Sequence, residues 1–318
     1  MNNLTVSKYW LGGNIFGYSA AENDVFEILE IAEQSGIVGI DTSSSYSDGQ
    51  SESIIGRWLK TNKNRANFTV ATKVGLRSHE SPKGLGSPSR IAESLYSSLD
   101  RLQTDYVDIL FLHAPDPETE VIETINALLD LKDKNIVRNF GVCNAKQDDV
   151  RNYISAFEKI GIPLKNLYIQ NYFNWARRGA NYWYKLQEAN SGERWQSVSY
   201  GLLGRGVFMP KINEFDAKSR KKMNAKIMME STNINLTKQL DLVNDICIKN
   251  GQSLYTFALA YGHYFSDFSI IGVRNISQLS MLINFKKTVM DQYVFETIRK
   301  QIESLNLDLN TGLGDPFI

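Results

Sequence analysis

Four side chains able to move protons or bind an oxygen atom stand at or near the ends of short apolar runs. Asp41 ends one such run, and Tyr46 follows it in a turn rich in hydroxyl residues. Lys73 and His113 end the next two runs. Proton donors and acceptors of these types serve in general acid–base catalysis and in stabilising charge on an oxygen. A charged residue at the end of a buried strand is costly unless it is paired, so the pattern favours a shared site.

Each of these residues also has a structural interpretation when it is taken alone. Asp41 could be a turn residue, and Tyr46 could pack on a surface rim. Lys73 could end a strand in solvent, and His113 could be a hydrogen-bonded core histidine. The functional interpretation requires all four side chains to lie close together. Whether they do depends on the strands and helices that carry them.

An alternation of strand-like and helix-like segments runs through the chain. Eight short runs are rich in β-branched and aromatic residues and mainly apolar, which is typical of strands buried on both faces. They cover residues 9–13, 38–41, 68–73, 107–113, 139–143, 167–170, 197–200 and 268–272. Amphipathic segments predict helices over 24–36, 87–102, 117–135, 147–161, 237–251, 253–265 and 277–287, with another helix starting near Ser51.

Strands that alternate with helices predict right-handed βαβ units and a parallel sheet. Two α/β architectures compete, a closed (β/α)₈ TIM barrel and an open doubly wound sheet. Eight units over 318 residues favour the barrel. The first strand is followed by GGNIFG, which does not fit the G-x-G-x-x-G of a doubly wound dinucleotide fold. We therefore expect a single domain over residues 1–318, with its chemistry at the carboxyl ends of the strands.

Composition excludes several classes of function. Lys plus Arg and Asp plus Glu each number 35, so no net charge attracts nucleic acid or an anionic membrane. No apolar run approaches the length of a membrane span, and no signal peptide is visible. Two cysteines and three histidines show no metal-ligand spacing, so no metal site is expected. Few cysteines suit a reducing compartment, and we expect a cytoplasmic protein.

The motif around the acid and the phenol resembles that of the aldo-keto reductases. The family pattern is Asp-Thr-Ala-x-x-Tyr-Gly-x-x-x-Ser-Glu, and this chain has DTSSSYSDGQSE (41–52), with Ser43 for alanine and Ser47 for glycine. Four later segments are similar to family motifs, with Cys143 where serine is usual: ATKVG (71–75), SLDRLQTDYVDILFLH (98–113), FGVCNA (140–145) and IQNYFN (169–174). The resemblance extends over about residues 9–284.

The resemblance implies reduction of an aldehyde or ketone, or oxidation of the matching alcohol or sugar. Tyr46 would be the general acid, or the base in oxidation. Lys73 would lower the pKa of this phenol, which is about 10 for a free tyrosine, and Asp41 would hold Lys73. His113 would orient the carbonyl oxygen and stabilise charge growing on it.

The implied cofactor is NADPH/NADP⁺, bound across the barrel mouth. Asn144 and Gln170 match positions that bind the carboxamide, and Tyr200 matches an aromatic residue that stacks on the ring. Leu203 closes the segment GLL (201–203), where the family often has Ser-Pro-Leu. In the eighth unit, the residues that match cofactor positions are Gly272, Arg274 and Gln278. Arg274 matches the position that binds the 2′-phosphate.

Two residues of the eighth unit depart from the family pattern. Met281 and Leu282 stand where an acid or amide pair usually holds the adenine, which leaves the choice between NADPH and NADH open. An amphipathic helix packing its core face is the structural interpretation, favoured for Leu282. Aromatic residues near the predicted mouth could stack on a sugar or an apolar aldehyde: Phe16, Tyr18, Trp175 and Phe208.

Three functions from different classes remain open on sequence alone. The first is an NADP-dependent reductase or dehydrogenase with a small-molecule carbonyl or sugar substrate. The second is a dinucleotide-binding regulatory or redox-sensing subunit on the same fold. The third is a sugar-modifying (β/α)₈ enzyme of another reaction type. The intact set of Asp41, Tyr46, Lys73 and His113 favours the first, and the sequence leaves the substrate, the direction and the oligomeric state undetermined.

Overall fold

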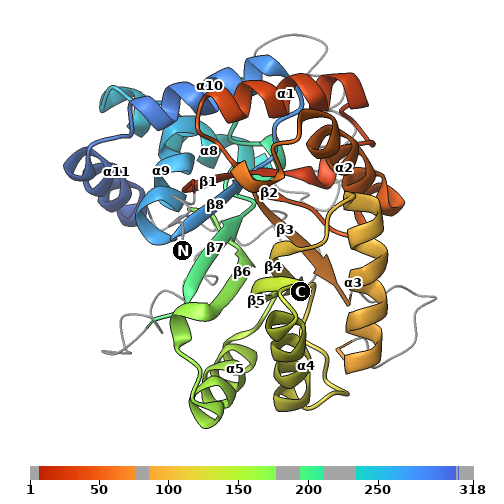
Figure 1. The fold of residues 1–318 in the computed structure, drawn as a ribbon. Helices are drawn as coiled ribbons and strands as arrows, with labels where there is room; N and C mark the ends of the chain where they lie inside the picture. The colour runs from red at the N-terminus through yellow and green to blue at the C-terminus, as the bar shows by residue number, and fades with distance from the viewer. Residues whose placement is uncertain (1–6, 76–85, 177–193, 211–233, 306, 308–318) are drawn as a thin grey trace. The chain divides into compact units, whose positions relative to one another are not determined.

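Eight parallel strands close into a barrel in the order β1 to β8, as the strand pattern predicts (Figure 1). The structure is a computed structural model, and it describes residues 7–75, 86–176, 194–210, 234–305 and 307. The strands are β1 (Tyr9–Gly12), β2 (Gly39–Asp41), β3 (Thr69–Val74), β4 (Val107–Leu112), β5 (Val137–Cys143), β6 (Leu167–Tyr172), β7 (Gln196–Tyr200) and β8 (Phe268–Ile271). Each observed strand overlaps a predicted run, and the ends differ by one or two residues.

Every predicted helix is present with similar bounds. The helices are α1 (Glu22–Gln34), α2 (Gln50–Asn62), α3 (Pro88–Leu102), α4 (Val121–Asp133), α5 (Gln147–Ile160), α8 (Ile234–Lys249), α9 (Leu254–Phe265), α10 (Ile276–Lys287) and α11 (Gln292–Ser304). Sequence analysis did not predict α11. Its signals were present, because Asp291 caps the helix through two backbone N–H groups and Phe295, Ile298 and Ile302 form a buried stripe.

Local sequence signals explain where several helices begin and end. Pro88 occupies the first turn of α3, where its missing N–H is not needed, and Ser87 is at the N-cap, although its side chain makes no capping hydrogen bond. Gly36 and Gly161 follow α1 and α5 with φ of 66° and 80°, a left-handed conformation that glycine adopts without strain. These two helices therefore stop where their glycines predict.

The chain divides into two compact units. The first contains Met1–Asn171, Tyr182–Ser199 and Ser266–Met281, and the second contains Tyr172–Asn181, Tyr200–Phe265 and Leu282–Ile318. The first unit includes β1 to β5, β8, most of β6 and β7, and the helices α1 to α5. The expectation of one functional domain over 1–318 stays a prediction.

Strand register aligns the carboxyl ends of neighbouring strands. Gly12 pairs with Asp41, and Asp41 pairs with Ala71 two residues before Lys73. Cys143 pairs with Gln170 in the same way on β5 and β6. Strands β1, β2, β3, β4 and β6 are buried along their whole length, so their apolar composition reflects burial on both faces.

Within the described part of the chain, no helix combines the length and the apolar character that a membrane crossing requires.

Candidate active site at the carboxyl ends of the strands

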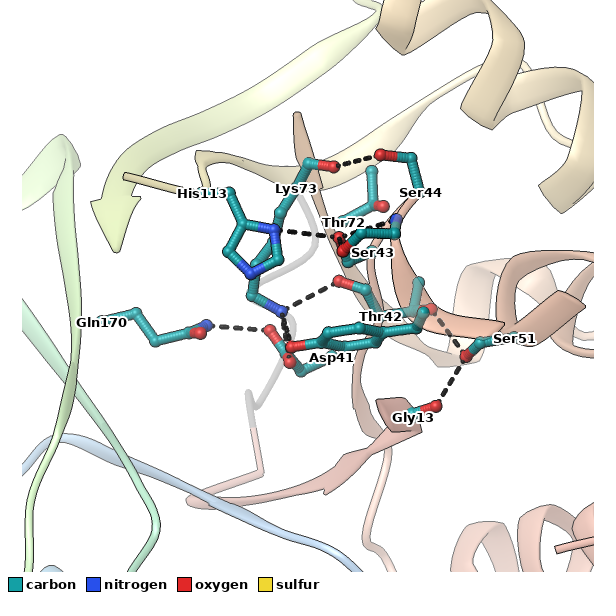
Figure 2. Close-up of polar contacts among 12 residues, drawn as sticks. Gly13, Asp41, Thr42, Ser43, Ser44, Ser51, Thr72, Lys73, His113 and Gln170 are labelled. Carbon is teal, nitrogen blue, oxygen red and sulfur yellow. Dashed lines mark hydrogen bonds and ion pairs between the residues drawn. The ribbon is translucent and has the colours of Figure 1, made fainter. Parts of the chain in front are cut away.

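Asp41, Tyr46, Lys73 and His113 come together at the carboxyl ends of β2, β3 and β4. Figure 2 labels Asp41, Lys73 and His113 in this cluster. Nζ of Lys73 donates hydrogen bonds to Oδ2 of Asp41 at 2.6 Å and to the hydroxyl oxygen of Tyr46 at 3.0 Å. The rings of Tyr46 and His113 lie edge to face, with centroids 5.9 Å apart. The convergence that motivated the functional interpretation is therefore present.

Lys73 uses all three of its donors inside the protein. Its third hydrogen bond goes from Nζ to the carbonyl oxygen of Thr42 at 3.0 Å. The side chain is 1% exposed, and an ammonium with three acceptors needs no water. Its position is therefore fixed by Asp41, Thr42 and Tyr46 together.

Two opposed influences set the pKa values of this ion pair. Burial, the largest influence on Lys73, favours the neutral amine, but Asp41, Tyr46 and Cys143 outweigh it and raise the pKa of Lys73. Burial also raises the pKa of Asp41, while donors on Lys73 and Gln170 oppose that rise. Lys73 is therefore a permanent cation beside Tyr46.

Burial dominates the ionisation of Tyr46. It raises the pKa of the phenol to about 12, although the positive charge of Lys73 acts in the opposite direction. The sequence analysis expected Lys73 to lower this pKa. Lys73 does so, but the net shift is upward because the half-buried phenol is shielded from water, which the sequence did not show. Tyr46 therefore carries its proton throughout the physiological pH range.

His113 is a neutral ring in this site. Burial and then the nearby charge of Lys73 lower the pKa of His113 to about 3. The side chain of Asn144 donates to the backbone carbonyl oxygen of His113 at 2.8 Å. The backbone N–H of His113 donates to the carbonyl oxygen of Val74 at 2.7 Å. These bonds fix the backbone from which the imidazole projects. A neutral imidazole carries one N–H, so it can donate one hydrogen bond.

Tyr46 begins a short 3₁₀ turn, η2 (Tyr46–Gly49), that leads into α2. Ser47 and Asp48 have φ of 51° and 53°, which costs non-glycine residues free energy, and Gly49 follows with φ of 83°. The hydroxyl of Ser47 donates to the carbonyl oxygen of Phe16 at 3.0 Å. Strained backbone of this kind persists only where surrounding contacts hold it.

The Ser-Glu pair that ends the motif holds α2 against the strands. The Ser51 hydroxyl lies 2.8 Å from both the Thr42 hydroxyl and the carbonyl oxygen of Gly13 (Figure 2). Glu52, which is fully buried, accepts hydrogen bonds from Thr72 and from Arg101. These two residues position the turn that carries Tyr46.

Gln170 contacts the same cluster from β6. Its Nε2 donates to Oδ1 of Asp41 at 2.8 Å, which fixes the orientation of the side-chain amide. Its Oε1 makes no hydrogen bond with any residue that the structure describes. The backbone N–H of Asn144 donates to the backbone carbonyl oxygen of Gln170 at 3.0 Å. The two residues predicted to bind a carboxamide are therefore neighbours.

Of the three cofactor residues predicted in the eighth unit, Gly272 and Arg274 lie in the loop between β8 and α10, and Gln278 lies in α10. Gly272 is exposed and Arg274 is half-buried, and Arg274 forms no ion pair with a described residue. Oε1 of Gln278 accepts a hydrogen bond from the backbone N–H of Arg274 at 2.9 Å. Gln278 thereby holds the backbone of Arg274, a contact that the sequence did not indicate.

Leu282 is fully buried and Met281 half-buried, so the structural interpretation of Leu282 as a core residue of α10 is confirmed. The other two residues predicted to bind the cofactor, Tyr200 and Leu203, belong to the second unit and are half-buried.

The backbone at position 201 and a neighbouring ring explain why glycine stands there in place of the serine of the family pattern. Its φ is 78°, and a Cβ there would lie 2.2 Å from the ring of Tyr172. Of the aromatic residues considered for substrate binding, Phe16, Trp175 and Phe208 are buried, and Tyr18 is exposed. The three buried rings are therefore packing residues in this structure.

Sequence analysis missed three contacts of the cluster. The carbonyl oxygen of Thr42 completes the shell of Lys73, and Gln170 binds Asp41. Ser43 lies with its hydroxyl 3.1 Å from Nδ1 of His113. A backbone carbonyl leaves no signal in sequence, but the hydroxyl of Ser43 at a strand end was visible. The described residues contain no group of three or more His, Cys, Asp or Glu side chains that could hold a metal ion.

Comparisons with known proteins agree with the fold and with the motif. Protein tas of Escherichia coli (strain K12) is 28% identical over 239 residues, which cover 66% of this chain and 68% of that protein. Norsolorinic acid reductase B of Aspergillus parasiticus is 28% identical over 296 residues, which cover 87% of this chain and 76% of that protein.

Solved structures of similar fold include the aldo-keto reductase AKR11C1 from Bacillus halodurans in its holo form. It matches with a TM-score of 0.74 and 22% identity, and the match covers 93% of this chain and 92% of that one. The glycerol dehydrogenase AKR11B4 from Gluconobacter oxydans matches with a TM-score of 0.71 and 22% identity, over 95% and 93% of the two chains. At this identity the two structures establish the (β/α)₈ fold.

A sequence model of one family spans almost the whole chain. The model of the aldo/keto reductase family matches residues 10–303, which include every strand from β2 to β8 and all four residues of the cluster. With this match and the oxidoreductase relatives, the protein is an oxidoreductase, and the chain belongs to the aldo/keto reductase family.

Proposed function

We propose that the protein is an NADP-dependent reductase of aldehydes or ketones, with Tyr46 as the general acid. The observation that carries the proposal is the hydrogen bond from Nζ of Lys73 to the hydroxyl oxygen of Tyr46, 3.0 Å long. An ammonium group can only donate, so Tyr46 accepts here, and its own proton is left to donate to another oxygen. A carbonyl oxygen at that position would receive this proton.

Each residue of the cluster has a part in that transfer. The bound dinucleotide would supply the hydride. Tyr46 gives its proton to the oxygen that gains negative charge, and the phenolate left behind is stabilised by Lys73. Asp41 holds Lys73 through the 2.6 Å ion pair. His113, a neutral ring, donates its single N–H to the same oxygen.

The raised pKa of Tyr46 suits reduction. With a pKa of about 12, the phenol is protonated and ready to donate at neutral pH. Oxidation of an alcohol needs the phenolate, whose fraction below the pKa rises tenfold for each pH unit. One relative is named as a reductase and one protein of the same fold as a dehydrogenase, so names for both directions occur among the similar proteins. We assign the reductive direction to this chain.

The residues around the cluster fit a nicotinamide dinucleotide. The side chain of Gln170 donates to Asp41 through Nε2, and its Oε1, which accepts no hydrogen bond from a described residue, could accept one from a carboxamide N–H group. The guanidinium of Arg274, which forms no ion pair with a described residue, suits a 2′-phosphate. Membership of a family that uses NADPH or NADH supports the same cofactor. These residues favour NADPH over NADH.

The test is a screen for cofactor consumption. The purified protein is mixed with NADPH or NADH and with a panel of aldehydes, ketones and keto sugars, and absorbance of the reduced cofactor is followed. We expect turnover with NADPH. In Tyr46→Phe, the single-turnover rate should fall by about 10²-fold or more, with NADPH affinity nearly unchanged.

The matched control is Tyr96→Phe, which removes the hydroxyl of a half-exposed tyrosine on α3. It should react at the wild-type rate. Retention of most of the single-turnover rate by Tyr46→Phe would exclude Tyr46 as the acid. Binding of NADPH without turnover of any compound would favour a regulatory subunit instead.

A further inference from the structure

Gln170 holds the buried carboxylate of Asp41 from the opposite side of the barrel. Its Nε2 donates to Oδ1 of Asp41 at 2.8 Å, and both residues are buried (Figure 2). In the closed order β1 to β8, three strands separate β2, which carries Asp41, from β6, which carries Gln170, in either direction. The bond therefore crosses the interior of the barrel and joins residues that are 129 positions apart in sequence.

The two oxygens of the Asp41 carboxylate have different partners. Oδ2 accepts from Nζ of Lys73 at 2.6 Å, and Oδ1 accepts from Gln170. An ionised carboxylate can only accept hydrogen bonds, so the amide nitrogen of Gln170, and not its oxygen, must face Oδ1. With one donor on each oxygen, the carboxylate is fixed from two directions.

The position of Lys73 depends on that carboxylate. Nζ also donates to the carbonyl oxygen of Thr42 and to the hydroxyl oxygen of Tyr46, so of its three acceptors Asp41 alone carries a charge. Without the donor on Oδ1, the carboxylate could rotate about its Cβ–Cγ bond and would draw Nζ with it. Such a displacement would weaken the 3.0 Å hydrogen bond between Lys73 and Tyr46.

We infer that Gln170 is a positioning residue that fixes the Asp41 carboxylate and, through it, the contact between Lys73 and Tyr46. This inference rests on the proposed function, in which Tyr46 is the general acid and Oε1 of Gln170 faces the carboxamide of the cofactor. The bond from Nε2 to Asp41 is a separate role of the same side chain. One amide group would then connect the cofactor with the residues that supply the proton.

The titratable groups around this contact leave a pH range in which the inference can be tested. Besides acting on each other, Asp41 and Lys73 are influenced by Tyr46 and Cys143. Burial raises the pKa of Tyr46 to about 12 and the pKa of Cys143 well above its ordinary value. Burial and then Lys73 lower the pKa of His113 to about 3. These three neighbours therefore keep their protonation states between about pH 5 and pH 8.

The first test is a double-mutant cycle on the cofactor-free protein, measured by urea denaturation. Gln170→Met has a similar length and cannot donate, so it should raise the unfolding equilibrium constant by roughly 10- to 150-fold, the equivalent of one hydrogen bond to a charged group. In the background Asp41→Asn/Lys73→Met, which has neither charge, the same substitution should raise it by only about 2- to 10-fold. Equal factors in the two backgrounds would overturn the inference.

The second test follows Lys73 by NMR of protein labelled with ¹⁵N-lysine, again without cofactor or substrate. A buried ammonium group with three acceptors exchanges its protons slowly with water, and the resonance missing from Asp41→Asn/Lys73→Met belongs to Lys73. Gln170→Met should shift this resonance and speed its proton exchange. An unchanged resonance in folded Gln170→Met would mean that Gln170 does not position Lys73.

Gln170→Glu gives the positioning role a pH signature. When the new carboxyl group is protonated it can donate to Asp41 as the amide does, and when it ionises the two carboxylates repel each other. At saturating NADPH and with a reactive carbonyl compound, the single-turnover rate of this variant should approach the wild-type rate near pH 5. It should fall to roughly a tenth of that rate or less by pH 8. Gln170→Met should be slower by roughly 2- to 10-fold, by the same factor at each pH.

Gln301→Glu is the matched control, because Gln301 is exposed on α11 and the substitution adds the same charge. Its rate relative to wild type should not change with pH. A relative rate of Gln170→Glu that is independent of pH would overturn the inference. Failure of the proposed function looks different, because the difference in stability and the shifted resonance of Lys73 would be present in a protein that reduces no carbonyl compound.

Discussion

At the scale of single residues, Tyr46 shows how burial and charge compete. The identity of its neighbour Lys73 was evident from sequence, and so was the direction in which an ammonium moves the pKa of a phenol. The shielding of the phenol from water depends on residues distant in sequence, such as His113, whose ring lies against that of Tyr46. The net shift, upward to about 12, could therefore be obtained only from the structure.

Removing Lys73 alone should destabilise the fold as well as slow the reaction. Lys73→Met leaves the carboxylate of Asp41 buried with one donor, Gln170, where the wild type has two. An unpaired buried charge of this kind costs about 3–5 kcal/mol of unfolding free energy. Urea denaturation of the purified variants measures this loss.

The double variant Asp41→Asn/Lys73→Met is the matched control for this prediction. It removes both charges and should recover a large part of the lost stability while remaining inactive. Equal stability of the single and double variants would mean that Asp41 is not held as a carboxylate by Lys73.

At the scale of elements, the turn η2 combines function with backbone strain. The family pattern has glycine at position 47, and Ser47 adopts the left-handed conformation that glycine accepts readily. Ser47 offsets part of this cost through its hydrogen bond to Phe16. Sequence comparison with the motif indicated the exchange, but only the backbone shows why glycine suits the position.

Two substitutions at Ser47 separate the strain from the hydrogen bond. Ser47→Ala keeps the strain and loses the bond, so it should destabilise the protein by about 1 kcal/mol. Ser47→Gly also loses the bond but relieves about 1–2 kcal/mol of strain, so it should be more stable than Ser47→Ala. Thermal or urea unfolding compares them. The opposite order, with alanine more stable, would show that the turn is not strained.

The loop after β8 is the second element with a testable role. Arg274→Ala should weaken NADPH binding by roughly 10- to 150-fold, because charge-assisted hydrogen bonds worth about 1.5–3 kcal/mol are lost. NADH lacks the 2′-phosphate, so its affinity should barely change. Fluorescence titration of both cofactors into wild type and variant measures the two affinities.

Arg90→Ala on α3 is the matched control, because Arg90 is exposed and its loss also removes one positive charge. It should leave both affinities unchanged. Rising salt should weaken the NADPH complex of the wild type more than that of Arg274→Ala. Equal losses for NADH and NADPH in Arg274→Ala would point to structural damage, and no loss for either would contradict the assignment.

At the scale of the whole molecule, acid stability depends on His113. Its folded pKa, about 3, lies below the unfolded value of about 6.5, so between these values the unfolded chain binds a proton that the native protein does not. The stability that the neutral ring contributes is complete above pH 6.5 and is lost as the pH falls toward 3. The slope is up to about 1.4 kcal/mol per pH unit.

Urea denaturation at pH 7, 6, 5 and 4 measures this slope. His113→Gln has no imidazole to protonate, so its unfolding free energy should fall less steeply than that of the wild type. Parallel curves for the two proteins would show that His113 is not a source of acid sensitivity.

Features that depend on a short run of sequence could be predicted, and features that depend on contacts between distant residues could not. The eight strands and the end of each could be predicted, because burial on both faces leaves runs of apolar residues. The four residues of the cluster followed from those ends. Contacts made by backbone atoms, such as Thr42 with Lys73, left no pattern. The hydrogen bonds of Gln170 and Gln278 to other parts of the site depend on side-chain orientation, which residue type does not determine.

A sheet that closes on itself has no outermost strand, and this affects how the protein can self-associate. An outermost strand offers unpaired N–H and C=O groups on which another chain can add, which is the usual route to fibrils and domain swapping. With β1 bonded to β8, the closed barrel formed by the described strands offers no such template. Growth of intermolecular sheet must therefore wait for the barrel to open, so the rate of fibril formation should follow the population of opened molecules.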